Sequence, residues 1–281
     1  MSTTGPKSIT TPIPVGPKQP PSPTPSDRPR SSAGTEDAAS YNEVPYPSFP
    51  FRKSHPDQLH TLGRLFGMAP ADTAACRVLE IGCAGGGNIL PMADQLPNSE
   101  FVGLDYSEVQ IRDAQAMVDR AGLTNVRVLA ADVSQVDPKT LGQFDYILCH
   151  GVYSWVPPVV QNAILDVCQR CLSPQGIAFI SFNTYPGWHF RGMIRDMMRY
   201  HVQQFKKAEV QINQARALLK FLAENANEGT AYGKLLKTEL ETLSRQSDSY
   251  LYHEHLESHN QPVYFHHFAE DLKRYHLQYL G

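Results

Sequence analysis

One run of residues, 78–88, constrains the fold of this chain more than any other feature. Its letters are VLEIGCAGGGN, an apolar segment followed by a loop dense in glycine. A buried strand that leads through such a loop into a helix is typical of α/β sheets. Glycine lets the backbone approach a ligand closely, and the free N–H groups of a helix start favour an anionic group. A tight strand–helix turn that holds no ligand is the simpler alternative.

The chain beyond this run alternates short apolar segments with amphipathic ones. This alternation predicts a doubly wound, mostly parallel, Rossmann-like α/β sheet. The expected strands are 78–81, 101–105, 125–132, 144–150 and 177–182, and the expected helices between them are 87–94, 107–121 and 159–172. We expect Ser107 to cap the second helix and Gly122 to end it. Further helices are expected at 191–205, 208–225 and 234–244, and a late strand at 277–280.

Each of the first three expected strands carries a carboxylate near its end. Glu80, Asp105 and Asp132 each lie at or near the end of a strand. In an open parallel sheet, ligands bind beyond the carboxyl ends of the strands. Three carboxylates there would repel a pyrophosphate, and they suit a ligand that carries an ammonium, a diol and an amine. For each acid, capping of the following helix is the alternative role.

The glycine spacing matches neither the dinucleotide fingerprint nor the phosphate loop. Glu80 stands two residues before Gly82, and Asp105 ends the next strand. This combination resembles motif I of the class I S-adenosylmethionine (SAM) methyltransferases, and the resemblance continues from about residue 55 to 190. Ala84 departs from the pattern, because many relatives have glycine there. NAD remains an alternative, since its ribose also binds an acid at the second strand, but the loop spacing argues against it.

The resemblance implies SAM as the cofactor and a set of side chains and backbone groups that hold it. Glu80 is expected at the methionine end, Tyr106 near the adenine and Asp132 at the adenine amine. The implied cofactor-binding residues are Glu80, Gly82, Cys83, Ala84, Gly85, Gly86, Asn88, Asp105, Tyr106, Ala131, Asp132, Val133 and His150.

Three segments outside motif I carry a narrower resemblance. Residues 41–57, 150–158 and 183–189 are similar to bacterial methyltransferases that carry an additional methyltransferase regulatory domain. That group includes protein lysine methyltransferases, so the resemblance implies methyl transfer to an acceptor, first of all a protein lysine amine. A small-molecule N- or O-methyltransferase is one alternative, and a non-catalytic SAM-binding or interaction module is another.

The acceptor side is expected to follow strands four and five. The candidate catalytic residues there are His150, Tyr153, Trp155 and Tyr185, with His150 and Tyr153 as possible proton acceptors. A desolvated aromatic pocket lowers the pKa of a lysine amine, and aromatic faces attract cations. Ordinary packing of a lid is the alternative for these rings. The Asn/Asp-Pro-Pro-Tyr/Phe signature of amide and adenine methylation is absent after strand four, which argues against those acceptors.

Composition and the resemblance together divide the chain into four parts. Residues 1–40 are rich in proline, serine and threonine and are expected to be a disordered tail. Residues 41–56 are interpreted as a lid, 57–190 as the SAM-binding core, and 191–281 as a helical segment with the start of a regulatory region. The resemblance implies two further strands after the fifth, so we expect either a truncated chain or one that lacks its last strand and its regulatory domain.

Charge and cysteine content exclude several classes of partner and site. The net charge is −3, which argues against a nucleic-acid partner. No apolar stretch is long enough for a membrane span or a secretion signal, so we expect a cytoplasmic protein. The cysteines number five, an odd count that favours free thiols. Six histidines in 253–276 are irregularly spaced, so no metal site is expected.

Overall fold

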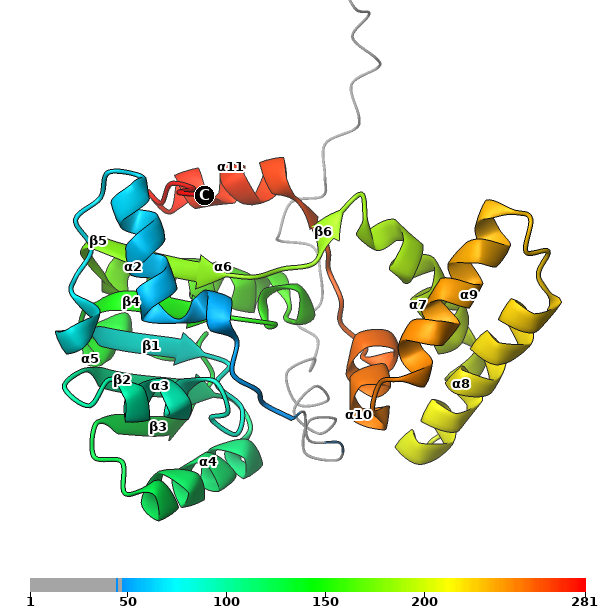
Figure 1. The fold of residues 1–281 in the computed structure, drawn as a ribbon, viewed down its shortest axis with the longest axis horizontal. Helices are drawn as coiled ribbons and strands as arrows, with labels where there is room; N and C mark the ends of the chain where they lie inside the picture. Colours follow the sequence, from blue (N-terminus) through cyan, green and yellow to red (C-terminus); the bar gives the residue numbers. More distant parts are fainter. Residues whose placement is uncertain (1–43, 45–46) are drawn as a thin grey trace, which may run out of the picture. The chain divides into compact units, whose positions relative to one another are not determined.

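The computed structural model describes Val44 and residues 47–281 (Figure 1). The predicted disordered tail, 1–40, lies outside the described residues. So does part of the predicted lid, including Tyr46.

Five parallel strands form the central sheet, in the order β3-β2-β1-β4-β5. Their bounds are β1 Arg77–Ile81, β2 Glu100–Asp105, β3 Val126–Ala130, β4 Phe144–Cys149 and β5 Leu172–Ile180. The strand order reverses between β1 and β4, so the sheet has the switch point at which ligands bind in doubly wound folds. This confirms the predicted fold class and brings all five carboxyl ends to one edge (Figure 1).

Helices cover both faces of the sheet because its strands are apolar on both sides. In β1, Val78 packs on one face, while Leu79 and Ile81 pack on the other. The first face is covered by α2 Pro56–Leu65, α3 Ile89–Gln95 and α4 Glu108–Ala121, and the second by α6 Pro158–Cys171 and α11 Phe265–Arg274. The shorter elements around the sheet are η2 Arg52–Ser54, η3 Thr73–Ala75, α5 Pro138–Leu141 and η4 Tyr153–Trp155.

The ends of α4 follow the sequence signals. The Ser107 side chain accepts a hydrogen bond from the backbone N–H of Gln110, as an N-cap does. Gly122 ends the helix with φ +66°, a left-handed conformation that glycine adopts at little cost. Both expectations are confirmed.

The helices beyond β5 bury an apolar cluster of their own. They are α7 Trp188–Val202, α8 Ala208–Asn225, α9 Ala231–Ser244, α10 Asp248–Leu251 and the π-helical turn η5 Tyr252–Leu256. Helix α8 has the bounds that the sequence predicts, and α7 begins three residues earlier than expected. The apolar stripe of α8 includes Ile212 and Leu219, both of which are buried in this cluster.

The strand expected at 277–280 is wrong. His276 has φ +54°, and the N–H of Leu277 donates to the carbonyl of Leu272, so these residues close the end of α11. Leu277 and Leu280 then pack against the two apolar clusters of the sheet without joining it. The chain from residue 262 is also expected to begin with a strand and a short helix, and the structure has both: β7 Val263–Tyr264 precedes α11 and pairs with β6 Thr184–Tyr185 in a separate two-stranded parallel sheet.

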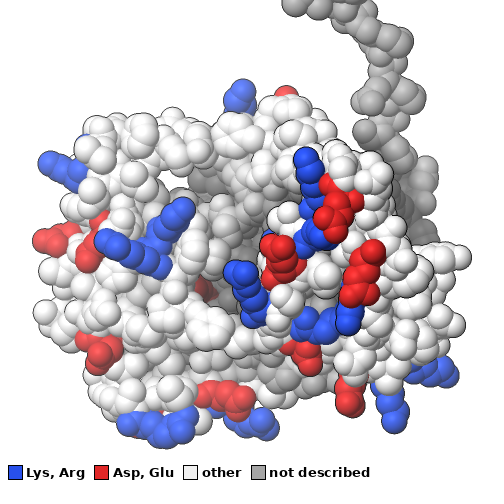
Figure 2. Space-filling view, turned by 45° about the vertical axis from the view of Figure 1, so that its right-hand side comes forward, with Lys and Arg blue, Asp and Glu red and all other residues white. Residues whose placement is uncertain are grey.

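Charged side chains of both signs are interspersed on the face that Figure 2 shows. The described residues include no helix that is long and apolar enough to cross a membrane.

The buried sheet gives a direct test of the core. Ile147 in the middle of β4 has no exposed surface, whereas Met117 on α4 is 45% exposed. We expect Ile147→Ala to lower the free energy of unfolding by about 2–5 kcal/mol, and Met117→Ala by less than ~1 kcal/mol. Urea denaturation of both variants measures the difference. Equal losses would contradict this assignment of the core.

Candidate functional site

The glycine loop leaves β1 through a turn that needs glycine. The N–H groups of Gly82 and Cys83 both donate to the carbonyl of Leu104, at 2.8 and 3.0 Å. Gly82 has φ +77°, and a Cβ atom there would lie 2.3 Å from the Val152 side chain. The loop is therefore held against the end of β2 and against the segment after β4.

Asp105 joins the loop to the helix after β2. Its carboxylate accepts hydrogen bonds from the N–H of Ala84, at 2.8 Å, and from the N–H of Ser107, at 2.9 Å. Burial raises the pKa of this carboxyl, and the backbone donors counteract that rise. A carboxylate has about four lone-pair sites, so Asp105 retains capacity to accept hydroxyl groups of a ligand.

Glu80 is the most constrained acid of the site. It is 3% exposed, and one of its oxygens accepts a hydrogen bond of 2.6 Å from the Asn88 side chain. The other oxygen, Oε2, is buried and has no partner. Burial raises the pKa of Glu80 to about 7. A buried carboxylate oxygen without a donor is costly, so this position fits the ammonium of a cationic ligand such as SAM.

The described part of the predicted lid lies against the glycine loop. The N–H of Phe51 donates to the Asn88 side chain at 2.8 Å, and Asn88 donates to the Ser54 hydroxyl at 3.1 Å. A Cβ atom on Gly87 would lie 2.1 Å from the Ser48 carbonyl oxygen. The backbone of the segment thus passes close against the loop, and its role as a lid stays a prediction.

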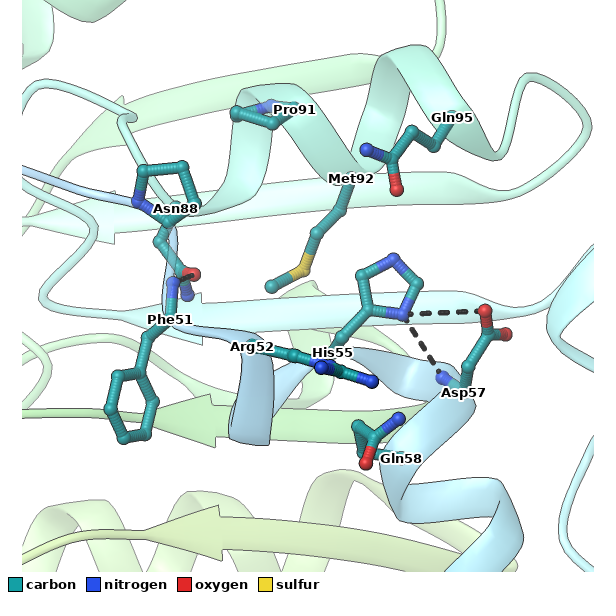
Figure 3. Close-up of a pocket in the computed structure, with 10 residues that line it drawn as sticks. Phe51, Arg52, His55, Asp57, Gln58, Asn88, Pro91, Met92 and Gln95 are labelled. Carbon is teal, nitrogen blue, oxygen red and sulfur yellow. Dashed lines mark hydrogen bonds and ion pairs between the residues drawn. The ribbon is translucent and has the colours of Figure 1, made fainter.

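A cavity of about 400 Å³ opens between this segment and α3 (Figure 3). Figure 3 shows Arg52, His55 and Met92 around it, with His55 in contact with Asp57 at the start of α2. Asn88 is the one predicted cofactor residue among those that line it. The cavity is therefore distinct from the edge where Glu80 and Asp105 lie.

The remaining predicted cofactor residues lie near the ends of β2 and β3. Tyr106 follows β2 and is 47% exposed, whereas Val133 is buried in an apolar cluster and Ala131 packs against that cluster. One carboxylate oxygen of Asp132 accepts from both the N–H and the hydroxyl of Ser134. Asp132 thus has the local turn role that sequence reasoning held as the alternative, and its contact with a ligand stays a prediction. Gly85 and Gly86 complete the loop, and Gly86 has φ +81°.

His150 ends β4 in an aromatic environment. Its ring stacks on Phe51 with centroids 3.8 Å apart, and Nδ1 lies 2.8 Å from the Ser181 hydroxyl. The same hydroxyl oxygen accepts from the N–H of Gly151. Burial lowers the pKa of His150, so the ring is neutral at physiological pH.

Tyr153 does not lie where the sequence placed it. Its side chain is 2% exposed and packs against Phe182 and Phe268, inside the core between the sheet and α11. Burial raises its pKa well above the usual value for tyrosine, which makes it a poor proton acceptor. Its spacing after β4 could not show which way the 3₁₀ turn η4 would aim the ring.

Trp155 and Tyr185 belong to two different groups of rings. Trp155 packs edge-on against Trp188 at 6.4 Å, with the guanidinium of Arg195 over its ring at 5.8 Å. Tyr185 lies on β6, where it stacks on His189 at 4.2 Å. Both residues follow the carboxyl ends of β4 and β5, as predicted.

Sequence reasoning missed three residues that support the site: Phe51, Ser54 and Ser181. Phe51 and Ser54 stood in the predicted lid, and their contacts depend on where the chain folds back. Ser181 had no local signal, because it meets His150 only through strand pairing.

The cysteines and histidines form no site of their own in the part of the chain that the structure describes. All five cysteines are free and buried. No group of three or more His, Cys, Asp or Glu side chains among these residues could hold a metal ion.

The backbone of the loop predicts opposite effects of two substitutions. Ala84 has φ +46°, which costs an L-residue about 1–2 kcal/mol and glycine almost nothing. We expect Ala84→Gly to change the free energy of unfolding by between zero and about +1 kcal/mol, because the extra freedom of glycine when unfolded offsets part of the gain. Gly82→Ala should destabilise by more than ~2 kcal/mol. Denaturant titration distinguishes them, and a clear loss in Ala84→Gly would contradict the loop geometry.

Glu80 predicts a dependence of stability on pH. Its pKa is raised from 4.5 to about 7 by burial, so its contribution to stability is complete below pH 4.5 and is lost as the pH rises through 7. Glu80→Gln cannot ionise, and its amide can still accept from Asn88. The variant should match the wild type at pH 4 and exceed it by about 3 kcal/mol at pH 8. Thermal melts across this range test it, and a constant difference would refute it.

Comparison with known proteins gives independent evidence on the same residues. Residues 78–176 match the model of a "Methyltransferase domain", which covers the glycine loop and the strands around it. Residues 247–281 match a "Predicted methyltransferase regulatory domain", which covers η5, β7 and α11.

Two curated relatives come from Rickettsia prowazekii. The chain is 45% identical to the uncharacterized protein RP789, over 86% of this chain and 44% of the relative. It is 42% identical to the uncharacterized protein RP028, over 84% of this chain and 94% of the relative. The solved structure of PKMT2 from Rickettsia typhi in complex with AdoHcy is 42% identical with a TM-score of 0.77, over 84% of this chain and 46% of PKMT2.

The chain thus spans less than half the length of RP789 and of PKMT2, and nearly all of RP028. The two family models, the parallel sheet and the loop geometry agree with one another. The chain belongs to the class I SAM-dependent methyltransferases, in the bacterial group that carries a methyltransferase regulatory domain.

Proposed function

We propose that this chain binds SAM at the edge formed by β1, β2 and β4 and catalyses methyl transfer to a protein lysine amine. One observation carries the cofactor half of the proposal. Glu80 holds a buried oxygen without a donor beside a glycine loop that is clamped by Asp105. This arrangement offers a carboxylate to a cation and a second carboxylate to hydroxyl groups.

The residues of the chain act mainly by holding and orienting. When bound, SAM supplies a methyl group that its sulfonium already activates. Catalysis then depends on proximity and alignment, and no nucleophilic side chain of the protein is required. Glu80 and Asp105 fix the two ends of the cofactor, and the segment 47–55 excludes water from the loop.

His150 is the proposed proton acceptor for the attacking amine. It ends β4, it is neutral because burial lowers its pKa, and Phe51 shields one face of its ring. If the proton of the neutral ring is on Nδ1, facing the Ser181 hydroxyl, the lone pair of Nε2 is free to accept a proton.

The acceptor amine is proposed to arrive near Trp155 and Trp188. Arg195 lies over Trp155, and Arg191 lies over Trp188 at 5.5 Å. Positive charges near a lysine disfavour its ammonium form and so lower its pKa. This environment supports a neutral, nucleophilic amine. The similarity to PKMT2, which hints at lysine methylation, supports a protein acceptor.

A small-molecule acceptor is the second candidate. The chain is 37% identical to a probable (S)-tetrahydroprotoberberine N-methyltransferase from Papaver bracteatum, over 27% of this chain. Because the match covers so little of the chain, it supports methyl transfer in general and gives little support to an alkaloid-like acceptor. We place the activity in the cytoplasm, with a protein partner as substrate and no nucleic acid.

Calorimetry tests the cofactor and tritiated SAM tests the acceptor. Asp105→Asn keeps the size of the side chain and one of its two backbone hydrogen bonds, but removes its charge. We expect it to weaken SAM binding by about tenfold or more, because hydrogen bonds to charged groups contribute about 1.5–3 kcal/mol.

Label from tritiated SAM should enter the protein fraction of a bacterial lysate. Label in the metabolite fraction alone would favour the second candidate, and no binding of SAM would refute both.

A further inference from the structure

Asn88 occupies the N-cap position of α3, but its side chain does not cap that helix. An asparagine at this position normally accepts a hydrogen bond from an N–H of the first helical turn. Here the amide oxygen accepts instead from the N–H of Phe51, at 2.8 Å. The amide nitrogen donates to Glu80 at 2.6 Å and to Ser54 at 3.1 Å. All three contacts are made outside the helix to which Asn88 belongs.

The three contacts join two parts of the chain that are far apart in sequence. Phe51 and Ser54 belong to the segment 47–55, which crosses the glycine loop, and Glu80 belongs to β1. The Ser54 hydroxyl also donates to the Phe51 carbonyl at 2.9 Å, so the segment is fixed at both ends of one short turn. Ser54, Glu80 and Asn88 are each at most 5% exposed, so water cannot replace these bonds freely.

The same amide therefore determines the position of the segment and the orientation of the carboxylate. With Glu80 Oε1 bound to Asn88, Oε2 is left buried and without a partner. A positive group that binds Oε2 stabilises the ionised carboxylate, and the ionised carboxylate strengthens the hydrogen bond from Asn88. Strengthening that bond also holds Asn88 in the orientation that binds Phe51 and Ser54.

We propose that Asn88 is a positioning residue that couples closure of the segment 47–55 to binding of the cationic end of the cofactor at Glu80. The proposal rests on the SAM-binding function proposed above. It adds that the segment 47–55 is a lid whose closure is linked to SAM binding. Asn88 acts through Glu80 and the segment, in place of the direct cofactor contact that the sequence predicted for it.

The groups that face Glu80 determine how the coupling depends on pH. Asp105 on β2 is a negative neighbour that raises the pKa of Glu80, while the hydrogen bond from Asn88 lowers it. The thiols of Cys83 and Cys149 also lie within range, and burial keeps both protonated by raising their pKa. Glu80 is therefore the group that ionises near neutral pH, and SAM should bind more tightly as the pH rises through that range.

Asn88→Ala removes the coupling and leaves the rest of the site in place. We expect SAM to bind about tenfold more weakly at pH 7, and the midpoint of its pH dependence to rise by about one pH unit. Calorimetry on the full chain from pH 5.5 to 9 measures both quantities. Ser54→Ala removes a contact of the segment without touching Glu80, so its pH midpoint should rise much less than that of Asn88→Ala.

Asn125→Ala is the matched control for a structural role. The Asn125 side chain donates to the carbonyls of Ala93, Leu96 and Ser99 and contacts neither Glu80 nor the segment. Its loss should lower stability, which denaturant titration reports, and leave the pH midpoint unchanged.

Trypsin gives a separate measure of closure, because Arg52 and Lys53 are exposed sites within the segment. SAM should slow cleavage after these residues several-fold in the wild type and much less in Asn88→Ala and Ser54→Ala. If the wild type binds SAM but Asn88→Ala keeps the same affinity, pH midpoint and protection, the coupling is refuted and the proposed function stands. If the wild type binds no SAM at any pH, the proposed function itself fails.

Discussion

The burial of one carboxylate, Glu80, determines how the rest of the site is arranged. A glutamate that is 3% exposed with a single side-chain donor is expensive to ionise, and its pKa of about 7 reflects that cost. The fold tolerates it at the point where β1 leads into the glycine loop, with β2 on one side and β4 on the other. The proposed binding of the SAM ammonium here would offset that cost, because a positive group stabilises the buried carboxylate.

The glycine loop is held close to the edge of the sheet where Glu80 and Asp105 lie. Ala84 holds a left-handed conformation that aims its N–H at Asp105, and Gly82 brings the loop against Val152. These contacts keep the backbone close to the sheet edge, which leaves the two acids facing the same region. Residues 247–281, which match the regulatory domain, contact the N-terminal part of the chain through the π-helical turn η5. There the Nε2 atom of His253 lies 2.6 Å from the Val44 carbonyl oxygen.

The repeating pattern of the sequence was enough to predict the sheet and most helices. Apolar segments at β-α-β spacing leave few alternatives, and Ser107 and Gly122 set the ends of α4 by local chemistry alone. The strand expected at 277–280 failed because its residues are taken up by the end of α11. The apolar residues there resemble a strand, but the N–H of Leu277 is already bound to the carbonyl of Leu272 in α11.

The site was predictable only where residues act through the backbone or at a strand end. Glu80 and Asp105 could be placed because parallel strands bring their ends together. The direction of a side chain after a strand depends on packing that the sequence does not encode locally. Tyr153 turns into the core, and Asn88 turns away from its own helix toward Phe51, 37 residues earlier in the chain. The place of Asn88 before α3 predicts a helix cap, but its contacts are set by how distant parts of the chain fold together.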